Sequence, residues 1–118
     1  MRLVDSSIWI DHIRRKDAEL TDWLLSEDVL THPMVVGEVL MGSIANRALV
    51  ARSMDELPSA VIASHQEVRA LAEQYTLYGR GIGFVDAHLL ASTRLTMGAR
   101  LETRDRRLKA LAVALGVG

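Results

Sequence analysis

The chain has 118 residues, of which 49% are hydrophobic and 25% are charged, a composition typical of a globular domain with its own core. It contains no cysteine, which excludes disulfides and thiolate metal sites, and its net charge of −1 does not by itself indicate a nucleic-acid binder. No apolar run is long enough to cross a membrane, and Asp5 stands where an export signal would be hydrophobic. We therefore expect one domain over residues 1–118, in a reducing cytoplasm.

Strand-like and helix-like segments alternate along the chain. Short apolar runs indicate strands, and apolar residues three or four positions apart indicate helices. The expected elements, in order, are a strand at 2–5, helices at 6–15 and 17–27, a strand at 28–32, helices from 33, at 46–57, at 64–79 and within 79–98, a strand at 99–103 and a helix at 105–116. This alternation predicts a small α/β domain with a mostly parallel sheet and helices on both faces.

Several helix starts carry local capping signals. Asp17 is a typical N-cap residue, and Pro33 suits the first position of a helix. Ser64 and Glu67 have the spacing of a capping box, in which each side chain binds a backbone N–H near the position of the other. These signals fix the expected starts of three helices.

Four acidic residues occupy positions that predict a shared site. In parallel α/β sheets ligands gather beyond the carboxyl ends of the strands, where Asp5 and Asp105 are expected. Glu38 and Asp86 lie on apolar helix faces, without a basic residue three or four positions away. We expect both to point inward. We also expect the core to include Met34, Met41, Met54 and Met97.

Each acid also has a purely structural interpretation. Asp5 and Asp105 can cap the helices that follow them, and Glu38 and Asp86 can form ion pairs with distant arginines. Four carboxylates in one pocket would instead repel one another unless cations lie between them.

Oxygen ligands favour Mg²⁺ or Mn²⁺, and the absence of cysteine with few histidines argues against zinc. Ser6, Ser7 and Thr103 are candidates to support such a site with their hydroxyl groups. Hydrolysis of phosphodiester bonds is the reaction class that fits it best.

The stretches LVDSSIWID, VVGEVLMG, GFVDAHLLAS and LETRDRRL together resemble the PIN-domain ribonucleases, in particular the VapC-like toxins of prokaryotic toxin–antitoxin pairs. The likeness covers essentially the whole chain, with the motifs in the family's order. It implies a PIN-like three-layer α/β/α domain and a Mg²⁺- or Mn²⁺-dependent endoribonuclease. The acidic quartet that it implies is Asp5, Glu38, Asp86 and Asp105.

The same resemblance implies a homodimer, an RNA substrate and a VapB-like antitoxin whose C-terminal segment fills the active-site groove. The chain departs from the pattern in being somewhat short, and Glu102 adds an acid beside the fourth motif. Arg104, Arg106 and Arg107 flank Asp105, where they are candidates either for RNA phosphate contacts or for a solvated charged face.

Other interpretations stay open. The chain can be a catalytically silent PIN-like module that binds a protein or RNA partner without cutting it. A metal-dependent phospho-acceptor domain is less favoured, because no second acid accompanies Asp5 beside the first strand. His88 lies opposite Asp86 on the expected helix, which favours a packing role for it. We expect Trp9 and Trp23 to lie in the core or at a protein interface.

Overall fold

Three short strands form the centre of the computed structural model, which describes residues 1–118. They are β1 (Arg2–Val4), β2 (Val29–Leu30) and β3 (Arg100–Glu102), and they pair in the order β2-β1-β3. Both pairings are parallel, with Leu3 opposite Leu30 and Leu101, so the predicted parallel sheet is confirmed. β2 is shorter than predicted because the chain turns at once into the next helix, for which His32 is the N-cap.

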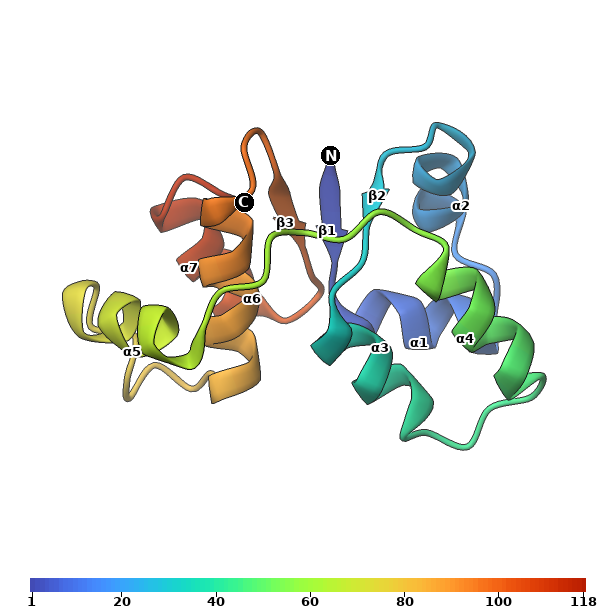
Figure 1. The fold of residues 1–118 in the computed structure, drawn as a ribbon, viewed down its shortest axis with the longest axis horizontal. Helices are drawn as coiled ribbons and strands as arrows, with labels where there is room; N and C mark the ends of the chain where they lie inside the picture. The colour runs from blue at the N-terminus through green and yellow to red at the C-terminus, as the bar shows by residue number, and fades with distance from the viewer.

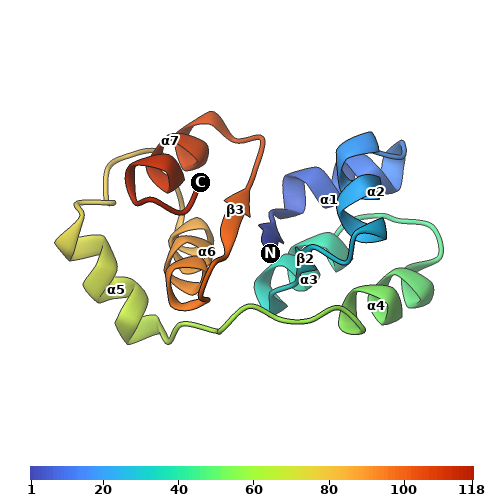
Figure 2. The ribbon, with the colours of Figure 1, turned by 90° about the horizontal axis from the view of Figure 1, so that it is seen from above.

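Seven helices surround the sheet, as the sequence predicts. They are α1 (Ser6–Arg14), α2 (Ala18–Leu25), α3 (Pro33–Leu40), α4 (Arg47–Asp55), α5 (His65–Gln74), α6 (Phe84–Leu95) and α7 (Arg106–Ala114). Figures 1 and 2 show α1–α4 on one side of the strands and α5–α7 on the other, joined by a connection that crosses the sheet between α4 and α5. No helix has the length and apolar character that crossing a bilayer requires.

The capping signals are confirmed. The Asp17 side chain accepts a hydrogen bond from the Leu20 N–H, Pro33 begins α3, and Ser64 and Glu67 form the predicted capping box. The helix expected over 64–79 nevertheless ends at Gln74. Thr76 adopts a φ of +52°, outside the helical region, so the backbone leaves the helix earlier than the sequence pattern indicates.

The core lies on both faces of the sheet and is mainly aliphatic, with Leu3, Leu89 and Leu101 fully buried. Among the methionines expected there, Met54 is buried, but Met41 and Met97 are 88% and 100% exposed. Met41 is the C-cap of α3, and Met97 follows the C-cap of α6. Helical periodicity no longer sets the direction of side chains at these positions, which is why that expectation is wrong.

Candidate active site

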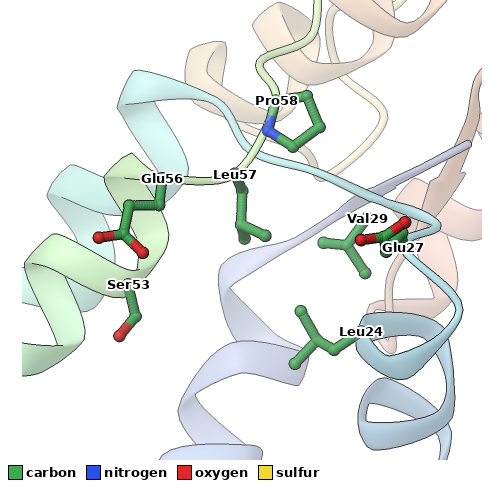
Figure 3. A pocket seen from close by; sticks show the side chains of 7 residues that line it. All are labelled: Leu24, Glu27, Val29, Ser53, Glu56, Leu57 and Pro58. Carbon is green, nitrogen blue, oxygen red and sulfur yellow. The ribbon is translucent and has the colours of Figure 1, made fainter.

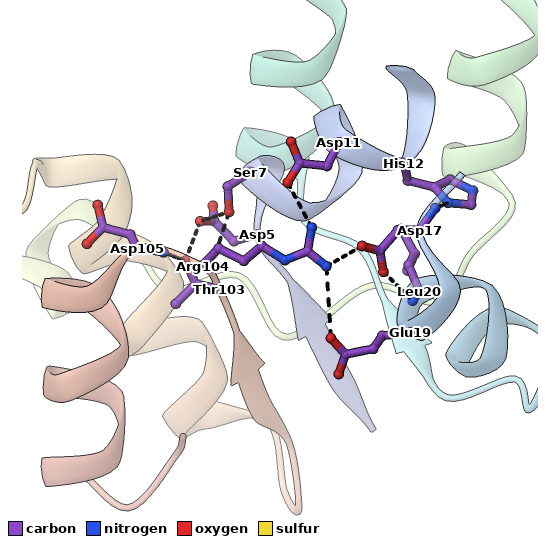
Figure 4. A network of polar contacts seen from close by, with 10 residues as sticks. All are labelled: Asp5, Ser7, Asp11, His12, Asp17, Glu19, Leu20, Thr103, Arg104 and Asp105. Atoms are coloured by element: carbon purple, nitrogen blue, oxygen red, sulfur yellow. Dashed lines mark hydrogen bonds and ion pairs between the residues drawn. The ribbon is translucent and has the colours of Figure 1, made fainter. Parts of the chain in front are cut away.

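Asp5 is the most firmly held acid of the quartet formed by Asp5, Glu38, Asp86 and Asp105. It follows β1, is 6% exposed and caps α1 by accepting a hydrogen bond from the Ser6 N–H at 2.7 Å. Its second oxygen accepts hydrogen bonds from the hydroxyls of Ser7 at 3.0 Å and Thr103 at 2.7 Å (Figure 4). The carboxylate is thus oriented by two segments that lie about a hundred residues apart in the chain.

Asp105 is an exposed cap at the neighbouring strand end. Its side chain accepts hydrogen bonds from the N–H groups of Arg107 at 2.9 Å and Leu108 at 3.0 Å, at the start of α7. Its own N–H donates to the Thr103 hydroxyl oxygen at 3.1 Å. Thr103 therefore connects Asp105 to Asp5, and both aspartates have the structural capping role that the sequence also allows.

Glu38 lies on the solvent-facing side of α3, which corrects the expectation that it points into the core. Val35 and Val39 form the buried face of this short helix, and the exposed Glu38 side chain lies at the edge of that face, next to Ser6. Its Oε1 atom accepts a hydrogen bond from the Ser6 hydroxyl at 3.3 Å, and the same hydroxyl lies 3.5 Å from Asp5 Oδ1. Ser6 thus brings α3 and the end of β1 together.

Asp86 is half-buried in the first turn of α6. Its Oδ2 atom accepts a hydrogen bond from the Gly83 N–H at 3.2 Å, which satisfies one donor at the start of the helix. None of the six ion pairs in the structure includes a member of the acidic quartet. The interpretation of Glu38 and Asp86 as partners of distant arginines is therefore wrong.

The quartet is electrostatically coupled. Partial burial raises the pKa of Glu38, and the negative charges of Asp5 and Asp86 raise it further, against the hydrogen bond from Ser6. Partial burial also raises the pKa of Asp86, and Asp5 and Asp105 add to this effect, against the hydrogen bond from Gly83. Because a like charge raises a carboxyl pKa only from nearby, Glu38 lies within the electrostatic field of Asp5 and Asp86, and Asp86 within that of Asp5 and Asp105.

The donor chemistry of this region fits a hard divalent cation, because carboxylate and hydroxyl oxygens are the ligands that Mg²⁺ and Mn²⁺ prefer. No three acidic or histidine side chains stand close enough together to enclose an ion as they are placed. Mutual repulsion gives a physical reason, since carboxylates without a cation between them gain by staying apart.

The flanking basic residues divide into two kinds. The Arg104 guanidinium binds Asp11 at 2.7 Å and also Asp17, so it joins the β3–α7 loop to α1 and α2 (Figure 4). Arg106 and Arg107 are exposed and form no ion pair. The Arg107 side chain lies against Gly81, in the loop that leads to Asp86.

The additional acid of the fourth motif belongs elsewhere. Glu102 accepts a hydrogen bond from the Arg2 guanidinium at 2.6 Å across the β1–β3 pair. Its charge is thereby matched, unlike the charges of the quartet. Sequence reasoning also missed the acidic partners of Arg104, because they lie 93 and 87 positions away and carry no local signal of pairing.

Histidines contribute to packing rather than to the acidic region. His88 is 2% exposed and shares a hydrogen bond with His65 at 2.7 Å, which agrees with the predicted packing role. His32 bonds the Ser92 hydroxyl at 3.0 Å, and burial lowers the pKa of both His32 and His88. Both rings are thus favoured in the neutral form inside the core.

A cavity of about 500 Å³ lies apart from the acidic quartet, between α2, β2 and α4 (Figure 3). Its lining combines apolar side chains with two carboxylates and comprises Leu24, Glu27, Val29, Ser53, Glu56, Leu57 and Pro58. It contains none of the residues that the sequence analysis selected. This cavity and the acidic quartet are therefore separate features of the structure.

Residues 2–114 match the family model of the PIN domain, and the chain therefore belongs to the PIN-domain family. The resemblance found in the sequence is confirmed, and with it the three-layer α/β/α fold. Over 117 residues the chain is 44% identical to Ribonuclease VapC32 of Mycobacterium tuberculosis, in strains CDC 1551 / Oshkosh and ATCC 25618 / H37Rv. The matched region covers 99% of this chain and 94% of each relative.

Proposed function

We propose that the protein is a Mg²⁺- or Mn²⁺-dependent endoribonuclease that acts as the toxin of a type II toxin–antitoxin pair. The similarity to proteins named Ribonuclease VapC32, over nearly the full length of both chains, supports the class of activity. The observation that carries the proposal is electrostatic. Glu38 and Asp86 have raised pKa values and no basic partner, in a region that they share with Asp5 and Asp105.

The four carboxylates would divide the work according to how they are held. Asp5 has a fixed orientation, because three donors bind it, and would provide the anchoring oxygen of the metal site. Glu38 and Asp86 are free to turn toward it, since each is held by a single hydrogen bond. A bound divalent ion would supply the positive charge that offsets these acids and polarises the phosphate.

Glu38 is the best candidate for the group that receives the proton of the attacking water. A carboxylate with a raised pKa is a stronger base than an ordinary one, and general bases work best when their pKa approaches the working pH. The Ser6 hydroxyl occupies Oε1, which leaves Oε2 for this proton. Ser6 would act as a positioning residue for Glu38, and Thr103 for Asp5 and the Asp105 loop.

Arg106 and Arg107 are the proposed contacts to the RNA backbone. Both guanidinium groups lack a protein partner, and Arg107 reaches the loop that precedes Asp86. Arg104 has a different part, because its guanidinium already bridges Asp11 and Asp17. It would hold the Asp105 loop against α1 rather than bind phosphate.

The test is an RNA cleavage assay with purified protein, free of any partner, in the presence of Mn²⁺. We expect the unmodified protein to cut single-stranded RNA and Asp86→Asn to be at least about 100-fold slower, since outer-shell partners of metal sites alone cost 10- to 100-fold. Asp22→Asn, at an exposed acid of α2 without an ion pair, is the matched control and should cut normally. Equal cleavage by Asp86→Asn would contradict the proposal.

A silent PIN-like module that binds its partner without cutting is the second candidate. The absence of a ready three-ligand cage in the structure is the observation that favours it. The same assay separates the two functions, because a silent module would bind RNA or a protein and leave the RNA intact.

We also propose a VapB-like antitoxin as partner and a homodimer as the functional form. The name VapC of the relatives supports the antitoxin partner, and the homodimer rests on the family resemblance of the sequence motifs. Expression of the chain alone should stop bacterial growth, and co-expression of the protein encoded beside its gene should restore it. Normal growth on expression of the chain alone would count against the toxin role.

A further inference from the structure

Two exposed aromatic rings stand at the start of α6 and in the loop that precedes it, and they have no part in the chemistry proposed so far. Tyr78, in the loop after α5, is 61% exposed, and Phe84, the first residue of α6, is 48% exposed. Phe84 precedes Asp86 by only two residues. Exposed apolar side chains that gather in one patch often mark an interaction surface.

Both rings line two cavities that therefore adjoin. The larger cavity, of about 470 Å³, combines the apolar Ala70 and Ala72 with the polar side chains of Gln66, Arg69 and Glu73. The smaller cavity, of about 200 Å³, is almost entirely apolar and includes Leu77, Ile82 and Ala87. An apolar slot beside a cavity with both apolar and polar walls suits a flat ring with a hydrogen-bonding edge, such as a nucleobase.

Phe84 is held in place before any ligand arrives. The buried His88 ring meets it edge-on at 4.8 Å between centroids, and the His65 ring lies 5.6 Å away. These two histidines are themselves joined by a hydrogen bond of 2.7 Å. A ring fixed from behind loses little freedom when a base stacks on its open face, which favours binding.

The start of α6 connects this pocket with the acidic quartet. Phe84 and Asp86 project from roughly opposite sides of the helix, since successive residues are about 100° apart. Between them lies the start of α6, where the Gly83 N–H donates a hydrogen bond to Asp86 Oδ2. A single strand that crosses this helix start would therefore join the pocket to Asp86.

We propose that Tyr78 and Phe84 stack a nucleobase of single-stranded RNA, near the phosphodiester bond presented to the acidic quartet. Gln66 and Arg69 provide donors, and Glu73 an acceptor, for the edge of that base or its neighbouring phosphate. This inference rests on the proposed nuclease function and adds a determinant of substrate choice. Single-stranded RNA is favoured over a duplex, because a paired base cannot enter the slot.

The test is fluorescence titration of a short RNA that carries 2-aminopurine, with Ca²⁺ present as a hard cation for the oxygen ligands. Stacking on the aromatic rings should quench the probe. Phe84→Leu and Tyr78→Leu keep an apolar side chain but remove the ring, and each should weaken binding about tenfold. An RNA hairpin with the same probe in its paired stem should bind more weakly than the single strand.

Tyr75→Leu is the matched control, because Tyr75 is an exposed tyrosine at the end of α5 whose ring lies under Arg94 at 4.8 Å. It should bind RNA as the unmodified protein does. Unchanged binding in both Phe84→Leu and Tyr78→Leu would overturn the inference. The inference would also be overturned if the unmodified protein bound no single-stranded RNA. The same holds if light scattering showed that the variants had lost only their association with a second copy of the chain.

Cleavage of a second, unlabelled RNA with Mn²⁺ keeps the two proposals apart. Suppose that the two leucine variants bind RNA more weakly, as expected, but the unmodified protein cuts no RNA. This result would support the stacking pocket and refute the nuclease. Cleavage by the unmodified protein, with unaltered binding in the variants, would do the reverse.

Discussion

Asp5 and Asp86 carry the same chemical group into the same electronegative region, but the fold treats them differently. Three donors from α1 and the β3–α7 loop satisfy the buried Asp5 carboxylate. Asp86 has one backbone donor, is partly desolvated and feels two neighbouring negative charges, which raise its pKa. One acid therefore stabilises the fold and the other costs stability. A single site can thus combine one carboxylate that stabilises the fold with others that are repelled by the negative charges of their neighbours.

Removal of the anchor should have the largest effect. Asp5→Ala deletes the cap of α1 and leaves the hydroxyls of Ser7 and Thr103 without their acceptor. We expect the free energy of unfolding to fall by about 3 kcal/mol, from the lost cap and the unsatisfied donors. Urea unfolding in EDTA measures this, and Asp22→Asn is the control. A variant as stable as the original would show that Asp5 is not the anchor.

Removal of the repelled charges should act in the opposite direction. Asp86→Asn and Glu38→Gln keep the shape of each side chain and eliminate one negative charge of the quartet. We expect both to raise the melting temperature in EDTA, through a gain in the free energy of unfolding of less than about 1 kcal/mol, because solvent screens these partly exposed groups. Mg²⁺ should then stabilise the variants less than the original protein. Destabilisation by both variants would refute the idea of stored repulsion.

The pH dependence of stability should show the same repulsion. Because the pKa values of Glu38 and Asp86 are raised in the folded state, the native protein binds a proton at each of these carboxyl groups more tightly than the unfolded chain does. Their contribution to stability is complete when the pH is below the ordinary carboxyl range of about 4, and is lost as the pH rises through the raised values. The stability gain of Asp86→Asn over the original protein should therefore grow from acidic to neutral pH. A gain independent of pH would contradict this.

The smallest effect is expected at Arg104. Its ion pairs with Asp11 and Asp17 are partly exposed, and exposed pairs contribute about 0.2–1 kcal/mol. Arg104→Gln should lower the free energy of unfolding by about 0.5 kcal/mol, and added salt should reduce the difference. Cleavage should change little if Arg104 only holds the loop. A large rise in the RNA concentration needed for cleavage would instead assign it a phosphate contact.

The parts of the fold that depend on local chemistry could be predicted from the sequence. Asp17, Ser64 and Pro33 mark helix starts because capping and a fixed φ act within one turn. The end of α5 could not be predicted, because Thr76 takes a left-handed conformation without a glycine to indicate it. The prediction that Met41 and Met97 are buried was wrong for a related reason. It extended the helical pattern beyond the last helical residue, where that pattern no longer determines which side chains face the core.

The candidate site shows the same division. Asp5 and Asp105 follow strands, and the parallel order of the sheet places both at one edge, which the alternating pattern implies. The exposed position of Glu38 and the partners of Arg104 depend on how distant elements pack, and neither has a local signature. The position of the Ser6 hydroxyl between the carboxylates of Asp5 and Glu38 likewise follows only from the folded structure.

Binding of Mn²⁺ tests the central claim most directly, since it asks whether the quartet shares a cation irrespective of any RNA. Electron paramagnetic resonance can count the free ion during titration of the original protein, Glu38→Gln, Asp86→Asn and the control Asp22→Asn. The account predicts a site in the original protein and in the control, weakened at least about tenfold in each quartet variant. Equal affinity in all four proteins, or no binding by the original protein, would contradict it.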